Sequence, residues 1–287
     1  MTMKSNQYAF FKSIFCTEFV KLSFFKMNVL LFLVIVLTHC NRNTVNEKQK
    51  VTKAFFNEKV KGISKDFSSY YSYRYYNIKL SRDFVGVDSS FMPIGKESFL
   101  RLLLTGKFMP VKIDTVPTYM LFKMPNDTKP EIISDVKYYA EKISFYMGME
   151  GKSMPSFNFK DINGDTYDNA SFEGKIVVIK CWYIGCVACI KEFPELNKLV
   201  EENKPYRDHI LFISFALDSK ERLKEFLSNR RLDYLVIPDA EGFISDSLHV
   251  DSYPTHILLD KKGKVVTYVN DVHDLIPALE KLKNKSN

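Results

Sequence analysis

The 287-residue chain has few cysteines and no long apolar segment, and each scarcity excludes a class of protein. Five cysteines are too few for a framework of disulfide bonds in a chain of this length. The longest uninterrupted apolar run, residues 29–37, has nine residues, whereas a membrane-spanning helix needs roughly 20. The composition is nevertheless 46% hydrophobic and 26% charged, which is typical of a chain with a packed core.

The positive charge is weak and scattered. Residues 1–39 hold four lysines and one glutamate, so they account for +3 of the net charge of +7. About +4 is left for the rest of the chain, with no dense basic stretch. A nucleic-acid-binding protein concentrates its lysines and arginines on one face or segment. We therefore expect no nucleic-acid partner.

Residues 1–39 have the features of an export signal. Lysines precede the apolar run 29–37, whose length suits the hydrophobic region of a signal peptide. Residues 37–40 (LTHC) resemble the bacterial lipobox, in which the cysteine, here Cys40, is lipidated and becomes the new N-terminus. The alternative is an uncleaved signal anchor formed by residues 22–37. Both interpretations export the rest of the chain and hold it at a membrane.

The exported part divides into three segments by composition. Residues 40–60 are mainly polar and charged, which suits a tether. Residues 61–150 carry mixed signals, with apolar spacing that predicts helices at 96–104 and 134–147 and a strand at 118–123. We interpret them as a small α+β region. They contain no catalytic constellation, so the sequence assigns them no function.

Tyrosines cluster within this region, at positions 70, 71, 73, 75 and 76. Aromatic side chains are common in strands. We therefore interpret the cluster as a strand with a structural role, and a ligand-stacking surface is the alternative.

Residues 151–287 alternate between strand and helix patterns. Asn163-Gly164 predicts the turn of a hairpin. Residues 176–182 are apolar apart from Lys180, which is typical of a central strand covered on both faces. The other expected elements are helices at 186–203, 219–229, 242–248 and 275–283 and strands at 210–216, 234–237, 255–259 and 264–269. This order predicts an α/β domain with a central mixed sheet flanked by helices.

Cys186 and Cys189 lie where the buried strand passes into a helix. The free N–H groups and the dipole of a helix N-terminus favour a thiolate at the first cysteine. The second sulfur lies one turn later, close enough to form a disulfide with the first. Such a pair attacks a substrate disulfide through Cys186 and releases the product through Cys189. A zinc site would need about two more ligands, and neither Cys181 nor the scattered histidines offer them, so we expect redox chemistry with no metal.

Glu192 follows Cys189 by one helical turn and shares a stripe with Leu196 and Leu199. A carboxylate on that sheet-facing stripe is expected to be partly desolvated. Desolvation would raise the pKa of Glu192 toward the range useful for accepting the proton of Cys189. A first-turn acid that favours the helix dipole is an equally weighted alternative.

Residues 154–283 resemble the thioredoxin-like disulfide reductases of the TlpA/ResA type. The matching motifs are Asn163-Gly164, Phe172-Glu173-Gly174-Lys175, Trp182, Cys186 with Cys189, Glu192-Phe193-Pro194 and Tyr253-Pro254-Thr255. The resemblance implies a thioredoxin-like fold, an active-site role for Glu192 and a cis bond before Pro254. It also implies that Tyr253, Pro254 and Thr255 bind an extended substrate.

The resemblance further implies an exported enzyme that faces the periplasm and reduces disulfides of exported proteins. Such an enzyme needs no cofactor. A membrane electron donor would re-reduce the cysteine pair. A thiol peroxidase would need the pattern Pro-x-x-x-Thr-x-x-Cys, where this chain has Ile179 and Tyr183. A metal carrier on the same fold, or a binding module that works through its N-terminal region, are the alternatives of another class.

Overall fold

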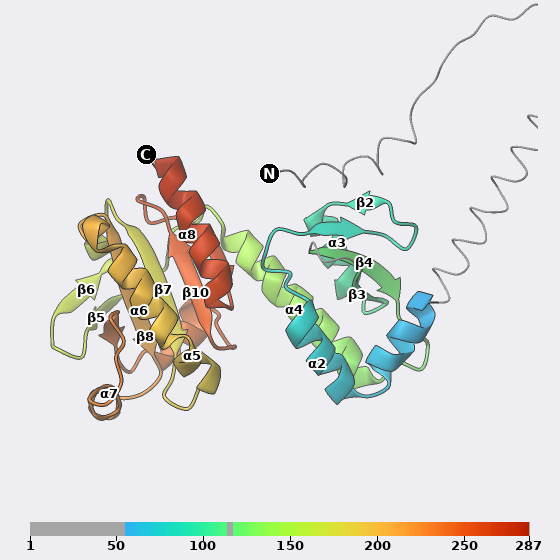
Figure 1. Cartoon of the computed structure of the whole chain (residues 1–287), viewed down its shortest axis with the longest axis horizontal. Helices are drawn as coiled ribbons and strands as arrows, with labels where there is room; N and C mark the ends of the chain where they lie inside the picture. Colours follow the sequence, from blue (N-terminus) through green and yellow to red (C-terminus); the bar gives the residue numbers. More distant parts are fainter. Residues whose placement is uncertain (1–54, 114–116, 287) are drawn as a thin grey trace, which may run out of the picture. The chain divides into compact units, whose positions relative to one another are not determined.

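The computed structural model describes residues 55–113 and 117–286 (Figure 1). The segment Val60–Asn287 is one compact unit, separate from Met1–Lys59. The predicted export signal and Cys40 lie outside the described residues. Among the helices that the structure describes, none is both long and apolar enough to cross a membrane.

A four-stranded sheet with three helices follows a helical stretch at residues 55–64. The strand order is β2-β1-β4-β3, with β4 antiparallel to β3 and parallel to β1. The elements are α2 (Phe67–Asn77), β1 (Val85–Val87), β2 (Pro93–Ile94), α3 (Lys96–Leu104), β3 (Phe108–Lys112), β4 (Thr118–Lys123) and α4 (Pro130–Met149). The α+β prediction for residues 61–150 agrees with this arrangement, and α3 and β4 have the predicted bounds.

The predicted tyrosine strand is wrong, because residues 67–77 form helix α2. Asp66 caps the helix, and its Oδ1 accepts a hydrogen bond from the backbone N–H of Ser69 at 2.7 Å. Tyr70 is buried, and the hydroxyl of Tyr73 accepts the backbone N–H of Lys112 at 2.8 Å. The helical spacing of three places these two tyrosines on one face. Both therefore attach α2 to the body of the unit.

The C-terminal part contains a five-stranded mixed sheet in the order β11-β10-β7-β8-β9. Strand β7 pairs in parallel with β8 and antiparallel with β10. The elements are β5 (Asn158–Lys160), β6 (Thr166–Asp168), β7 (Ile176–Trp182), α5 (Val187–Lys191), α6 (Phe193–Glu202), β8 (Ile210–Ala216), α7 (Lys220–Leu227), β9 (Leu235–Ile237), the π-helix η4 (Phe243–Ser247), β10 (Thr255–Leu259), β11 (Val265–Val269) and α8 (Val272–Ser286). This is the central mixed sheet that the strand and helix pattern predicts, in the thioredoxin-like arrangement that the resemblance implies.

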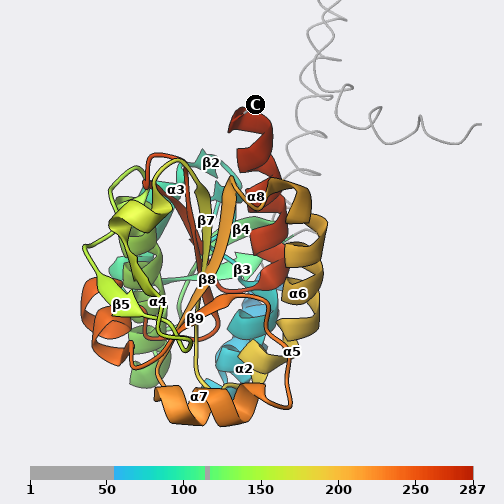
Figure 2. The ribbon, with the colours of Figure 1, turned by 90° about the vertical axis from the view of Figure 1, so that its left-hand side faces the viewer.

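One face of β7 packs against two helices. Helices α6 and α8 lie along one face of the five-stranded sheet (Figure 2). Ile176 and Val178 pack there with Leu196 and Leu199 of α6 and with Leu275 of α8. Side chains alternate along a strand, so the next even-numbered residues of β7 point to this face as well.

Candidate active site

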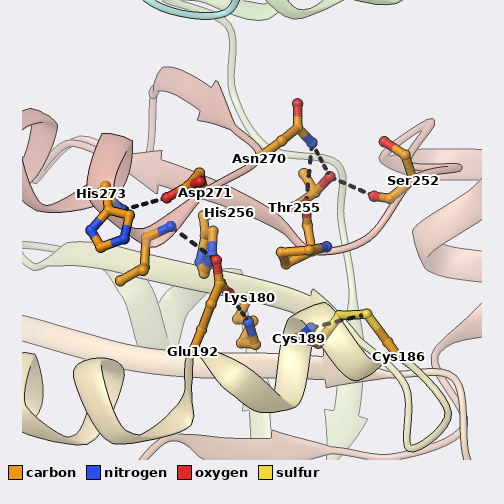
Figure 3. Close-up of polar contacts among 12 residues, drawn as sticks. Lys180, Cys186, Cys189, Glu192, Ser252, Thr255, His256, Asn270, Asp271 and His273 are labelled. Carbon is orange, nitrogen blue, oxygen red and sulfur yellow. Dashed lines mark hydrogen bonds and ion pairs between the residues drawn. A yellow bond between two sulfur atoms is a disulfide. The ribbon is translucent and has the colours of Figure 1, made fainter. Parts of the chain in front are cut away.

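Cys186 and Cys189 form a disulfide at the start of α5, with their Cα atoms 5.2 Å apart (Figure 3). Cys186 is the N-cap residue of α5, and its Sγ accepts the backbone N–H of Cys189 at 3.2 Å. Cys186 is 5% exposed, whereas Cys189 is 0% exposed. Of the two cysteines, Cys186 therefore has the larger exposed fraction.

The helix that the sequence predicts from 186 to 203 is divided into α5 and α6, which meet at Glu192. Pro194 lies in the first turn of α6 and has no N–H to bond back into α5. Glu192 ends one helix and begins the next. Its side chain turns toward the sheet (Figure 3).

The carboxylate of Glu192 accepts three hydrogen bonds in the oxidised protein. Its Oε2 lies 2.6 Å from the Nζ of Lys180 and 3.1 Å from the Nε2 of His256. Its Oε1 accepts the backbone N–H of Val272 at 2.9 Å. The side chains of Lys180 and His256 are 0% exposed. Lys180, Glu192 and His256 therefore form a buried polar cluster, which we call the charge cluster.

The charge cluster keeps Glu192 ionised. Burial raises the pKa of Glu192, but the hydrogen bonds from His256 and Lys180 and the positive charge of Lys180 outweigh it and lower the pKa to about 2. The raised pKa that we expected from the helical spacing is therefore wrong. The physical reason is that the sheet supplies a cation and an N–H donor to this carboxylate.

His256 is the neutral member of the charge cluster. Burial, and then the positive charge of Lys180, lower its pKa, and its Nδ1 has no hydrogen-bond partner in the structure. A proton on Nδ1 would be buried without an acceptor, which is costly. Neutral His256 therefore donates through Nε2 to Glu192, and Lys180 provides the balancing charge.

The peptide bond between Tyr253 and Pro254 is cis, which agrees with the geometry that the resemblance implies. It lies in the loop of residues 249–254 before β10, which we call the cis-proline loop. The rings of Tyr253 and Tyr183 meet edge to face with centroids 5.3 Å apart. Thr255 opens β10 opposite Cys181 of β7. The cis-proline loop and the segment that leads into the disulfide therefore lie at the same end of the sheet.

Thr255 is hydrogen-bonded to the cis-proline loop and to Asn270. Its side chain is buried, donates to the backbone oxygen of Ser252 at 2.7 Å and accepts from the Nδ2 of Asn270 at 2.7 Å (Figure 3). The same Nδ2 donates to the backbone oxygen of Pro254 at 3.2 Å. Of the three residues expected to bind substrate, Tyr253 is half-buried, whereas Pro254 and Thr255 are buried.

Asp218 is a residue of the site that the sequence reasoning missed. Its Oδ2 accepts the backbone N–H of Ile184 at 2.7 Å, and its Oδ1 lies 2.9 Å from Arg222. The bond fixes the segment just before Cys186. Asp218 follows β8, and polar residues after parallel strands gather at one edge of a sheet. Its position directly after a parallel strand could therefore have identified Asp218 as a candidate site residue.

Cys181 is a buried free thiol. As an odd-numbered residue of β7 it points away from the face of the charge cluster. Burial raises its pKa to about 12. Cys181 is therefore a small buried residue of the central strand.

Comparisons with known proteins identify the family. The family model described as AhpC/TSA matches residues 151–268. The thiol-disulfide oxidoreductase ResA of Bacillus thuringiensis subsp. konkukian is 34% identical over 119 residues, which are 40% of this chain and 66% of that protein. ResA of Bacillus cereus (strain ZK / E33L) is 31% identical over 132 residues, 45% of this chain and 72% of that protein. The thioredoxin domain of a thiol-disulfide oxidoreductase from Bacteroides vulgatus has a TM-score of 0.42 and 25% identity, and the match covers 46% of this chain and 96% of that domain.

The match to these curated relatives spans about two thirds of their length. The family-model match over residues 151–268 includes the disulfide, the charge cluster and the cis-proline loop. On this fold and this identity, the chain belongs to the ResA-type thiol-disulfide oxidoreductases.

Proposed function

We propose that this protein is an exported, membrane-anchored thiol-disulfide oxidoreductase that reduces disulfide bonds of exported proteins through Cys186 and Cys189. The observation that carries the proposal is the disulfide at the start of α5, at the same end of the sheet as the cis bond before Pro254. A dithiol that can close across one helical turn transfers two electrons without a cofactor.

The reaction begins with the reduced pair. The thiolate of Cys186 attacks one sulfur of the substrate disulfide, a mixed disulfide forms, and the displaced substrate sulfur takes up a proton. Cys189 then loses its proton and attacks the Sγ of Cys186. The substrate leaves as a dithiol, and the protein keeps the disulfide that the structure shows. Two electrons from a membrane donor would restore the pair.

The division of labour rests on exposure. Cys186 is the more exposed of the two cysteines, and it caps α5, where backbone N–H groups favour the thiolate. Cys189 has no exposed surface, so its sulfur serves the second, internal attack.

Glu192 is proposed as the residue that exchanges a proton with Cys189. Its lowered pKa makes it a weak base, so a proton taken from Cys189 would stay on the carboxylate only briefly before passing to solvent. Because an ordinary thiol has a pKa of about 8.5, transfer of its proton to Glu192 is uphill while the charge cluster is intact. Tyr253 and Pro254 are proposed to bind the extended backbone of the substrate, with Thr255 bracing them.

The cellular location is proposed from the N-terminal sequence and from the relatives. Lipidation at Cys40, or an uncleaved anchor, would place the active site on the periplasmic side of a membrane. Mass spectrometry of the mature N-terminus tests this part: a lipid-modified Cys40 supports the lipoprotein, and an unprocessed N-terminus supports the anchor.

The test of the activity is reduction of insulin disulfides with dithiothreitol as electron source. We expect turnover by the wild type, none by Cys186→Ser, and a rate within about twofold of wild type for Cys181→Ala, the matched control on the opposite face. Turnover by Cys186→Ser at the wild-type rate would contradict the proposal.

Two further measurements separate the alternatives. The thiol-peroxidase hypothesis makes hydrogen peroxide the second substrate to try, and faster consumption of peroxide than of insulin disulfides would favour it. Tight stoichiometric copper or zinc in equilibrium dialysis would favour a metal carrier.

A further inference from the structure

Helix α4 of the N-terminal region contacts the cis-proline loop. The Nζ of Lys142 donates to the Oγ of Ser252 at 3.0 Å and lies 3.8 Å from the Oδ1 of Asp251. These residues are 110 positions apart in the chain. The Lys142 side chain is only 10% exposed. Burial lowers its pKa, and the charge of Asp251 opposes that effect. Burying an ammonium group is costly unless it has polar partners. Ser252 and Asp251 therefore stabilise Lys142 in this position.

The rest of the same helical face fixes the neighbouring residues. Burial, and then the neighbouring Asp251 carboxylate, raise the pKa of Tyr138. The ring of Phe145 meets His249 edge to face at 4.8 Å. Tyr146 stacks on Tyr268 of β11, with centroids 4.5 Å apart and planes at 13°.

Position 142 is four residues from 138, three from 145 and four from 146, which places all four side chains on one face of the helix. One face of α4 therefore contacts the cis-proline loop at its start and near its end, and it also contacts the strand beside β10.

The loop that α4 holds adjoins the disulfide. Ser252 directly precedes Tyr253, whose ring packs on Tyr183, three residues before Cys186. A shift of Ser252 would therefore move the backbone that is proposed to pair with the substrate. It would not move the two sulfur atoms, which are fixed by β7 and α5.

We propose that Lys142 is a positioning residue through which the N-terminal region holds the cis-proline loop in the shape that binds a disulfide-bearing polypeptide. This inference rests on the proposed function. It assigns a role to residues 61–150, which the sequence left without one. The substrate class follows from the chemistry: an extended chain needs the loop, whereas a small dithiol reaches Cys186 without it.

The experiment compares Lys142→Met with Lys142→Arg, and with Lys137→Met as the matched control on an exposed position of α4. In Lys142→Met we expect the KM for insulin to rise roughly five- to tenfold. The kcat, and the rate at which dithiothreitol reduces the Cys186–Cys189 disulfide, should stay within about twofold of the wild-type values. Lys142→Arg keeps a donor and should recover most of the loss. Lys137→Met should behave as wild type.

A second variant removes the same hydrogen bond from the loop side. Ser252→Ala should raise the KM as well, and the double variant Lys142→Met/Ser252→Ala should add little to either change. An unchanged KM in both single variants, or a parallel fall in the dithiothreitol rate, would overturn the inference.

Amide hydrogen exchange of residues 249–254 provides a readout that does not depend on turnover. We expect faster exchange there in Lys142→Met than in wild type and Lys137→Met. If the wild type fails to reduce insulin, the proposed function is contradicted while this exchange measurement still decides whether Lys142 positions the loop. Unchanged exchange would overturn the positioning role itself.

Discussion

Lys180 of β7 and His256 of β10 are directly opposed in the antiparallel register, and both bind the same carboxylate oxygen of Glu192. Val178 and Leu258 precede and follow them on the same face, packed against α6 and α8. The polar pair thus lies within an otherwise apolar face, because Trp182 follows Lys180 on the same side of β7. Glu192 reaches it from the junction of α5 and α6, one turn beyond the disulfide.

This pairing predicts a change in pH dependence when Lys180 is replaced by Met. Without the ammonium of Lys180, one of the groups that lower the pKa of Glu192 is lost, while burial still raises it. The pKa of Glu192 therefore rises. The wild type should show no titration of Glu192 in its rate of disulfide exchange above pH 4. Lys180→Met should show a new inflection between about pH 5 and 7, and Lys180→Met/Glu192→Gln should lose it.

The matched control is Lys191→Met, an exposed lysine of α5, which should leave the profile unchanged. An inflection in the wild type that Glu192→Gln abolishes would contradict the account. Glu192 would then titrate in the range that its helical spacing first suggested.

Acid stability provides an independent test of the same cluster. A pKa lowered from 4.5 to about 2 corresponds to roughly 3 kcal/mol of unfolding free energy. Because the folded-state pKa is depressed, this contribution is present above about pH 4.5 and is lost as the pH falls toward 2. The stability gap between the oxidised wild type and Glu192→Gln should therefore narrow over that range in urea titrations.

Glu202→Gln, at an exposed position of α6, is the control and should show no such convergence. A constant gap for Glu192→Gln from pH 6 to 2 would mean that the carboxylate is not stabilised in its ionised form.

Asp218 should matter for the segment before Cys186. Asp218→Ala leaves the backbone N–H of Ile184 without its acceptor, so we expect a loss of about 1–3 kcal/mol of unfolding free energy. Amide exchange at Ile184 should also become faster. Arg222→Ala removes only an exposed partner and should cost less than about 1 kcal/mol. Equal losses in the two variants would assign the effect to the ion pair.

The strands of the five-stranded sheet were predictable where burial is strong. Strands β7, β8 and β10 have the bounds that their apolar runs indicated, because a strand covered on both faces shows a continuous apolar pattern. Strand β3 was missed because Pro110 reads as a breaker. It is an edge strand in the sheet order, where a proline's missing N–H costs no ladder bond.

The disulfide was also predictable, because its two cysteines lie one helical turn apart, whereas the cis bond before Pro254 was implied only by the resemblance. The charge cluster was not predictable. Lys180 stood out only as an exception in an apolar run, and His256 was taken as isolated. Their contact with Glu192 depends on the register between β7 and β10, which no local pattern encodes. The same holds for Lys142 and the cis-proline loop.

The most direct test of the central claim is the covalent intermediate on Cys186. Cys189→Ala, expressed as the full chain, should accumulate mixed disulfides with other proteins, visible as adducts that dithiothreitol removes. Peptide mass spectrometry should place them on Cys186, and Cys186→Ser/Cys189→Ala should form none. If Cys189→Ala forms no adducts, or Cys186→Ser forms them through Cys189 as readily, Cys186 is not the attacking thiol.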